Sequence, residues 1–143
     1  MNPVIGYAPG VFDLLHAGHI NLLWRAKRLC DVLVVGVVSG RGVMQYKARW
    51  PAEEIYNRIH AVSSLGFVDV VVEQCTTDPT PMLERFRPAK LFHGDDWKEL
   101  LEGHEALARL GIEWVSIPYT QGISTTQLRA MGTPLEQQLR GVA

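Results

Sequence analysis

The 143-residue sequence predicts an α/β fold in which helices cover both faces of a parallel sheet. Two observations predict it. Short apolar segments alternate along the chain with segments whose apolar residues recur at helical spacing. In addition, residues 32–38 read Val-Leu-Val-Val-Gly-Val-Val, a run without a polar side chain, which is typical of a strand covered on both faces.

Five apolar segments are expected to form the strands. The first is residues 3–7, and the Ala8-Pro9-Gly10 turn is expected to end or bend it. The others are short runs rich in β-branched or aromatic residues, which favour strands. They are residues 32–38, 68–72, 90–93 and 114–117.

Helices are expected between the strands. From about residue 18, apolar side chains recur every three residues as far as Leu29. Pro51 suits the first turn of a helix, Glu53 and Glu54 suit its positive end, and Gly66 can stop it. The remaining helices are expected from residue 79 or 81 to 86, from about 98 to 110, and from 124 onward. The whole predicts a single Rossmann-like domain over residues 1–131, a five-stranded parallel sheet sandwiched by helices, with a C-terminal tail at 132–143.

Composition excludes several classes of function. The formal net charge is -1, which does not suggest a surface built to bind nucleic acid or anionic lipid. Cys30 and Cys75 form neither a CxxC pair nor a metal spacing, and they are expected to be buried or inert thiols. The first residues lack a secretory pattern, and no apolar run is long enough to span a bilayer. We therefore expect a cytoplasmic protein with no nucleic-acid or membrane partner.

Side chains suited to phosphate binding follow the first strand. Residues 10–19 read Gly-Val-Phe-Asp-Leu-Leu-His-Ala-Gly-His, so that His16 and His19 share one face at the start of a helix. Gly18 leaves room for a ligand, Gly10 lets backbone amides approach it, and a helix N-terminus favours an anion. We favour a phosphate pocket over two structural histidines or two metal ligands, since no third ligand stands at a useful spacing.

A second candidate phosphate site follows the last strand. It combines a flexible glycine with hydroxyl residues that commonly cap helix N-termini. Taken alone, the segment favours simple capping, but beside the first motif it favours binding of nucleotide phosphates. Its residues are Gly122, Ile123, Ser124, Thr125 and Thr126.

Together the two segments resemble the HxGH nucleotidyltransferases, and within them the cytidylyltransferases. His16-Ala17-Gly18-His19 matches the HxGH signature, Gly-x-Phe-Asp at residues 10–13 matches its lead-in, and residues 122–126 match the G-I-S-T-T element. Both signatures in this order on an alternating strand-helix pattern are far more specific than either alone. The resemblance covers about residues 4–129, and residues 94–97, Gly-Asp-Asp-Trp, are similar to bacterial glycerol-3-phosphate cytidylyltransferases.

The resemblance implies a role for each matching residue. Lys47 lies in an expected flexible loop at 39–50 and otherwise reads as a solvated charge, while Arg58 otherwise reads as an exposed helix residue. Asp95 and Asp96 suit ribose hydroxyls, a metal or a turn. The implied catalytic residues are His16, His19 and Lys47, and the implied substrate-binding residues are Asp13, Arg58 and Lys47. The implied nucleotide-binding residues are Gly10, Val11, Phe12, Gly18, Asp95, Asp96, Gly122, Ile123, Ser124, Thr125 and Thr126.

The resemblance also implies the reaction. A phosphate oxygen of a phosphorylated small alcohol, such as glycerol 3-phosphate, or of a similar phosphonate attacks the α-phosphorus of CTP in line, and pyrophosphate leaves. Mg²⁺ is expected to be held mainly by nucleotide phosphates and water, with no protein metal ligand, and a homodimer is expected.

Some residues depart from the glycerol-phosphate pattern and keep alternatives open. Those enzymes commonly show R-T-E-G where this chain has Tyr119-Thr120-Gln121-Gly122, and a basic residue where it has Gly66. Gly66 before Phe67-Val68-Asp69 is similar instead to heptose-phosphate adenylyltransferases. The alternatives are therefore an adenylyltransferase that uses ATP on a sugar phosphate or FMN, and a non-catalytic nucleotide-binding module.

Overall fold

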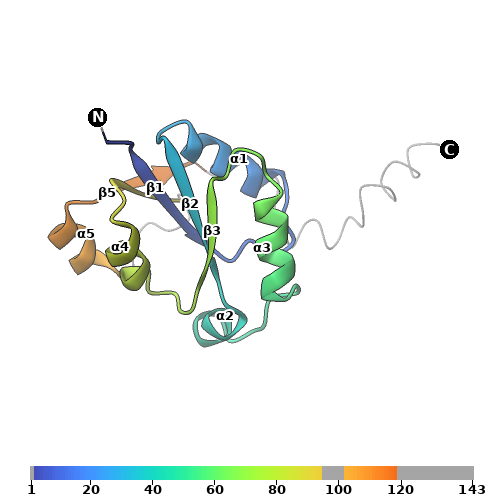
Figure 1. Cartoon of the computed structure of the whole chain (residues 1–143). Helices are drawn as coiled ribbons and strands as arrows, with labels where there is room; N and C mark the ends of the chain where they lie inside the picture. Colours follow the sequence, from blue (N-terminus) through green and yellow to red (C-terminus); the bar gives the residue numbers. More distant parts are fainter. Residues whose placement is uncertain (1, 95–101, 119–143) are drawn as a thin grey trace.

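Five parallel strands form a single sheet in the order β3-β2-β1-β4-β5, as predicted (Figure 1). The computed structural model describes residues 2–94 and 102–118. The prediction of an α/β, Rossmann-like sheet flanked by helices is confirmed. The strands are β1 (Ile5–Gly10), β2 (Val32–Val38), β3 (Val70–Gln74), β4 (Lys90–Gly94) and β5 (Glu113–Ile117).

Helices lie on both faces of the sheet and close a separate core on each. α1 and α3 pack on one face, and α4 and α5 pack on the other (Figure 1). The first core includes the fully buried Leu23, Val35 and Val62, and the second includes Tyr7, Leu83 and Leu91. The helices are α1 (Ala17–Lys27), α2 (Gly40–Lys47), α3 (Ile55–Ser63), α4 (Thr80–Phe86) and α5 (His104–Leu110).

The strand order reverses between β1 and β4, and the two strands part there. β1 pairs with β2 along its whole length, whereas its pairing with β4 stops at Tyr7 and Leu91. Ligands of open α/β sheets bind outside the carboxyl ends of the strands at such a reversal. The fold therefore places the expected site at the end of β1, where the segment containing His16 and His19 begins.

β1 is longer than predicted. Ala8-Pro9-Gly10 was expected to end or bend the strand, but all three residues continue it beside β2. Proline cannot donate a ladder hydrogen bond, so it is tolerated where one side of a strand is unpaired. Pro9 lies beyond the last β1–β4 pair, which explains how a central strand accommodates it.

The predicted loop at residues 39–50 is wrong, because most of it is helix α2. Ser39 caps this helix by accepting a hydrogen bond from Gly42 N at 3.1 Å and donates one to Cys75 O at 2.7 Å. Gly42 is needed because a Cβ there would lie 3.0 Å from Cys75 O. Gly42, one of the glycines that suggested a loop, therefore allows helix α2 to pack closely against the chain that follows β3.

Other element boundaries also shift. α3 begins at Ile55 rather than at residue 51, because Asp13 holds the amides of residues 52 and 53 outside the helix. β3 is shifted by two residues at both ends relative to the predicted 68–72, because Gln74 still pairs with Val38 of β2 and its side chain accepts a 2.5 Å hydrogen bond from the Tyr7 hydroxyl. α5 begins at His104 rather than near residue 98. The helix expected from residue 124 and the tail at 132–143 lie outside the described residues, and the domain boundary after residue 131 stays a prediction.

Two further observations concern the predicted cellular context. Cys75 is exposed and Cys30 is partly buried, so of the two expected alternatives, buried or inert, burial does not hold for Cys75 and its inertness stays a prediction. Within residues 2–94 and 102–118, no helix is long and apolar enough to cross a membrane.

We predict that Gly36→Ala destabilises the sheet by about 1–3 kcal/mol through overpacking. A Cβ at Gly36 in β2 would meet the hydroxyl end of the Tyr7 ring, which must keep its place to bond Gln74. The free energy of unfolding from urea titration measures the effect. Gly66→Ala is the control, because a Cβ at Gly66 meets no atom within 4 Å. Equal stability of the two variants would contradict this account of Gly36.

Candidate active site

The two histidines of the HxGH segment cap helix α1 reciprocally. His16 is the N-cap residue, and its Nδ1 accepts a hydrogen bond from Gly18 N at 3.0 Å. His19 Nδ1 accepts from His16 N at 3.3 Å, which closes a capping box. The imidazole rings stack with centroids 3.9 Å apart and planes 26° apart. The predicted pairing of His16 and His19 on one face of the helix is thus present in the structure.

This capping fixes which nitrogen of each ring can donate. A neutral imidazole carries one proton, so a ring whose Nδ1 accepts a backbone amide proton must carry its own proton on Nε2. Both His16 and His19 therefore present an Nε2–H donor. The first turn of α1 contains no acidic residue, so the positive end of the helix is not neutralised locally. Two donors and a helix N-terminus form a site for an anion.

The electrostatics of the site keep both rings neutral. Burial lowers the pKa of His16 below its usual 6.5. For His19, burial is the largest cause of a pKa lowered to about 4, and the neighbouring His16 and Lys47 lower it further while Asp13 opposes them. At neutral pH the rings are therefore uncharged hydrogen-bond donors rather than cations.

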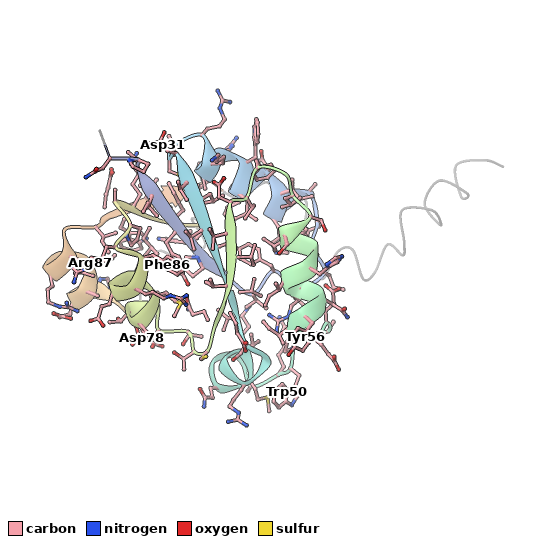
Figure 2. The ribbon with its side chains drawn as sticks, viewed as in Figure 1. Asp31, Trp50, Tyr56, Asp78, Phe86 and Arg87 are labelled. Atoms are coloured by element: carbon pink, nitrogen blue, oxygen red, sulfur yellow. The ribbon has the colours of Figure 1, made fainter. Side chains whose placement is uncertain are left out.

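The charge of Lys47 acts on the His19 ring from a different element. Lys47 is the last residue of α2, on an exposed helical turn. The C-cap residue of α2 is Ala48, which adopts the left-handed conformation. Between Ala48 and α3 lies the exposed Trp50, and the exposed Tyr56 lies on α3 itself (Figure 2). The predicted catalytic residues His16, His19 and Lys47 are thus brought into one electrostatic neighbourhood.

Gly10 and Phe12 support the His19 ring. The Phe12 side chain is buried and meets His19 edge-to-face, with ring centroids 5.7 Å apart. A Cβ on Gly10 would lie 2.8 Å from the Phe12 ring. The glycine that was predicted to admit a nucleotide therefore also makes room for the aromatic ring behind the histidine.

Asp13 and Arg58, predicted to bind substrate, contact the backbone. The Asp13 carboxylate accepts from Ala52 N at 2.8 Å and from Glu53 N at 3.0 Å. Arg58 is fully buried, contrary to its alternative interpretation as an exposed helix residue. Its Nη1 donates to Val11 O at 3.0 Å and Val38 O at 2.6 Å, and its Nε donates to Glu53 O at 3.0 Å. These bonds join the ends of β1 and β2 to the start of α3.

Sequence reasoning missed the contribution of Glu53. Its side chain accepts a hydrogen bond from Leu14 N at 2.6 Å, in the segment just before His16. In that segment Phe12 and Leu14 have φ of 52° and 50°, the left-handed region that bulky residues rarely adopt. The only signal in the sequence was an acidic residue near a predicted helix start. Such a residue predicts a favourable interaction with the helix dipole, but it does not predict a hydrogen bond to a residue 39 positions away.

Several predicted site residues lie outside the described residues. They are Asp95, Asp96, Gly122, Ile123, Ser124, Thr125 and Thr126, so their placement stays a prediction. Of the other nucleotide-binding predictions, Gly18 is buried in the first turn of α1, and Val11 follows β1 directly. Within the described part of the chain, no three His, Cys, Asp or Glu residues lie close enough together to hold a metal ion.

We predict that acid destabilises the fold through His19. Its pKa of about 4 in the folded state lies below the usual 6.5, so the unfolded state binds more protons between these values. The free energy of unfolding should therefore fall as the pH drops from 6.5 toward 4. Urea titrations across this range should show a shallower dependence for His19→Asn, whose side-chain oxygen can still accept from His16 N.

The exposed His60 on α3 provides the matched control for this prediction. His60→Asn makes the same substitution at a position outside the candidate site. An equal change of slope in the two variants would contradict the assignment to His19.

The amino-acid sequence of the chain is similar to those of a known protein family and of several bacterial proteins. The cytidylyltransferase-like family matches residues 7–131. "Bifunctional protein HldE" from Bradyrhizobium diazoefficiens is 37% identical over 132 residues, which are 90% of this chain and 27% of that protein. The protein of the same name from Caulobacter vibrioides is 36% identical over 128 residues, 88% of this chain and 26% of that protein. The chain thus spans about a quarter of the length of these relatives.

Solved structures share the fold. A lipopolysaccharide core biosynthesis protein from Thermoplasma volcanium superposes with a TM-score of 0.67 at 24% identity, over 83% of this chain and 98% of that one. A pantoate-beta-alanine ligase from Francisella tularensis superposes with a TM-score of 0.62 at 17% identity, over 96% of this chain and 69% of that one. These structures support the sheet and helix arrangement alone. Since the family match extends over most of the sequence, the chain belongs to the cytidylyltransferase-like family of nucleotidyltransferases.

Proposed function

We propose that the chain transfers the adenylyl group of ATP to a sugar phosphate and releases pyrophosphate. The observation that carries the nucleotidyl-transfer chemistry is the pair of Nε2–H donors that His16 and His19 hold at the N-terminus of α1. They are joined by the positive charge of Lys47, which acts on the same histidine. The arrangement suits a phosphate group whose negative charge increases during the reaction.

The choice of ATP and a sugar phosphate is supported by two observations. The relatives at 36–37% identity carry the HldE name, and residues 66–69 resemble heptose-phosphate adenylyltransferases. Gly66, where glycerol-phosphate enzymes tend to have a basic residue, has open space around it. A Cβ there would meet no atom within 4 Å, so a clash at that atom does not account for the missing charge. This favours an acceptor other than glycerol 3-phosphate.

A second candidate is transfer of a cytidylyl group from CTP to a phosphorylated small alcohol. It is supported by the resemblance of residues 94–97 to glycerol-3-phosphate cytidylyltransferases and by the family to which the chain belongs. The two candidates share the histidine site and differ in the base and the acceptor. A homodimer stays a prediction for either, and light scattering of the purified chain tests it.

The proposed mechanism is the in-line displacement that the family resemblance implies, and the two histidine donors suit it. An acceptor phosphate oxygen forms a bond to the α-phosphorus while the bond from that phosphorus to the β-phosphate bridging oxygen breaks, and pyrophosphate carries away the electron pair. No protein nucleophile is needed, because a phosphate oxygen is ionised at neutral pH. His16 and His19 donate to the non-bridging α-phosphate oxygens, and these bonds strengthen as charge builds. Mg²⁺ held by phosphate oxygens and water would neutralise part of the nucleotide charge.

Pyrophosphate release tests the proposal. ATP and CTP are each combined with sugar 1-phosphates, glycerol 3-phosphate, phosphocholine, phosphoethanolamine, FMN and simple phosphonates, in the presence of Mg²⁺. We expect acceptor-dependent release with ATP and a sugar phosphate. Release only with CTP and a phosphorylated alcohol would establish the second candidate instead. Binding of nucleotide without release for any pair would favour the non-catalytic nucleotide-binding module.

We predict that His19→Asn lowers kcat by about 10²–10³-fold, the usual effect of removing one donor from a developing oxyanion. The asparagine oxygen can replace Nδ1 as the acceptor from His16 N, but the shorter side chain cannot replace the Nε2–H donor. The folded state should therefore survive while turnover is lost. Steady-state kinetics and thermal unfolding of the variant measure both, with His60→Asn as control, and an unchanged kcat would remove His19 from the mechanism.

A further inference from the structure

Glu53 uses each of its polar groups to join the segment before the histidines to the segment before α3. Its carboxylate accepts from Leu14 N at 2.6 Å, and its own amide donates to Asp13 Oδ1 at 3.0 Å. Its carbonyl accepts from Arg58 Nε at 3.0 Å. The bonds between residues 13–14 and 53 run in both directions, so they close a ring of side-chain and backbone groups.

This ring holds a segment that local preference alone would not maintain. Leu14 adopts a left-handed conformation only two residues before His16, and Phe12 does so two residues earlier. Left-handed non-glycine residues persist only where their surroundings over-determine the conformation. The bond from Leu14 N to Glu53 fixes the peptide group that leads into the N-cap of α1.

The same ring links the histidines to the lysine. Five residues separate Lys47 from Glu53, and the amide of one of them, Ala52, donates to Asp13 at 2.8 Å. The end of the segment that starts at Lys47 is therefore attached to the segment that leads to His16. A shift of one of these segments would be transmitted to the other.

We propose that Glu53 is a positioning residue that sets the placement of the His16 and His19 donors, and of Lys47 relative to them, for nucleotidyl transfer. This inference rests on the proposed function. In this proposal Glu53 acts through Leu14 and Asp13, because its carboxylate accepts the Leu14 amide and its own amide donates to Asp13. Its neighbour Glu54 is exposed and makes no side-chain capping bond, although it shares the charge and the place in the chain.

Three variants separate positioning from charge. Glu53→Ala removes the acceptor, Glu53→Gln keeps an oxygen acceptor without the charge, and Glu54→Ala is the matched control. We expect Glu53→Ala to lower kcat by about 10²-fold, as a small misplacement of catalytic groups does, with little change in the KM for nucleotide. Glu53→Gln should recover most of kcat, and Glu54→Ala should match the wild type. Equal kcat for Glu53→Ala and Glu54→Ala would overturn the proposal.

A second readout does not depend on turnover. The groups that act on His19 are His16, Asp13 and Lys47, and its low pKa depends mainly on burial of the ring. We expect the NMR titration of His19 to move up toward 6.5 in Glu53→Ala and to stay in place in Glu53→Gln. Hydrogen exchange at the Leu14 amide should accelerate in the alanine variant only. An unchanged titration in the folded Glu53→Ala protein would overturn the proposal.

The two readouts distinguish failure of this proposal from failure of the proposed function. If the wild type releases no pyrophosphate with any acceptor, the proposed function fails, and the NMR titration still decides whether Glu53 places the histidines. If Glu53→Ala does not fold, Glu53→Asp takes its place, because its carboxylate is one methylene too short to keep the bond to Leu14. A folded Glu53→Asp protein with wild-type kcat and wild-type His19 titration would likewise overturn the proposal.

Discussion

The reciprocal capping of α1 by His16 and His19 is the interaction on which the rest of the site depends. The helix needs acceptors for its first amides, and a good side-chain cap contributes about 1 kcal/mol. Here imidazole Nδ1 atoms supply them. Because each Nδ1 accepts a backbone proton, each neutral ring must carry its own proton on Nε2. The bonds that begin the helix thus also determine which donors are available to the proposed reaction.

The backbone that leads to the two histidines is strained, and hydrogen bonds from residues distant in the sequence offset this strain. Left-handed backbone at Phe12 and Leu14 costs of order 1–3 kcal/mol for each residue. The offsetting bonds come from Asp13, Glu53 and the buried Arg58, whose guanidinium donates to three carbonyls at the ends of β1 and β2 and before α3. A buried guanidinium needs hydrogen-bond partners, and in Arg58 the Nε and Nη1 atoms have them, whereas the buried Nη2 has none. The sheet edge, the strained segment and α3 are consequently one unit.

Sequence patterns predicted what depends on local periodicity and failed where a distant partner decides. Residues 32–38 form β2 as predicted, because an uninterrupted apolar run of this length strongly favours a strand buried on both faces. The extension of β1 through Pro9 depends on where the pairing between β1 and β4 stops. Residues 8–10 carry no information about that end point. The motif predicted that the two histidines share one face of the helix start, since three-residue spacing is a local property, and the structure adds that their rings stack. Nothing near Arg58 indicates burial, because charged residues on helices are usually solvated.

The neutrality of the two rings is itself part of how the site can work. Two imidazolium cations with centroids 3.9 Å apart would repel each other in a desolvated setting, and burial keeps both rings neutral instead. A neutral donor attracts the ground-state phosphate less strongly than a cation does. Its hydrogen bond still strengthens as negative charge accumulates on the phosphate oxygens, so a larger share of the interaction appears only in the transition state. If the two rings act as proposed, the packing that buries them would favour turnover over tight binding of the nucleotide.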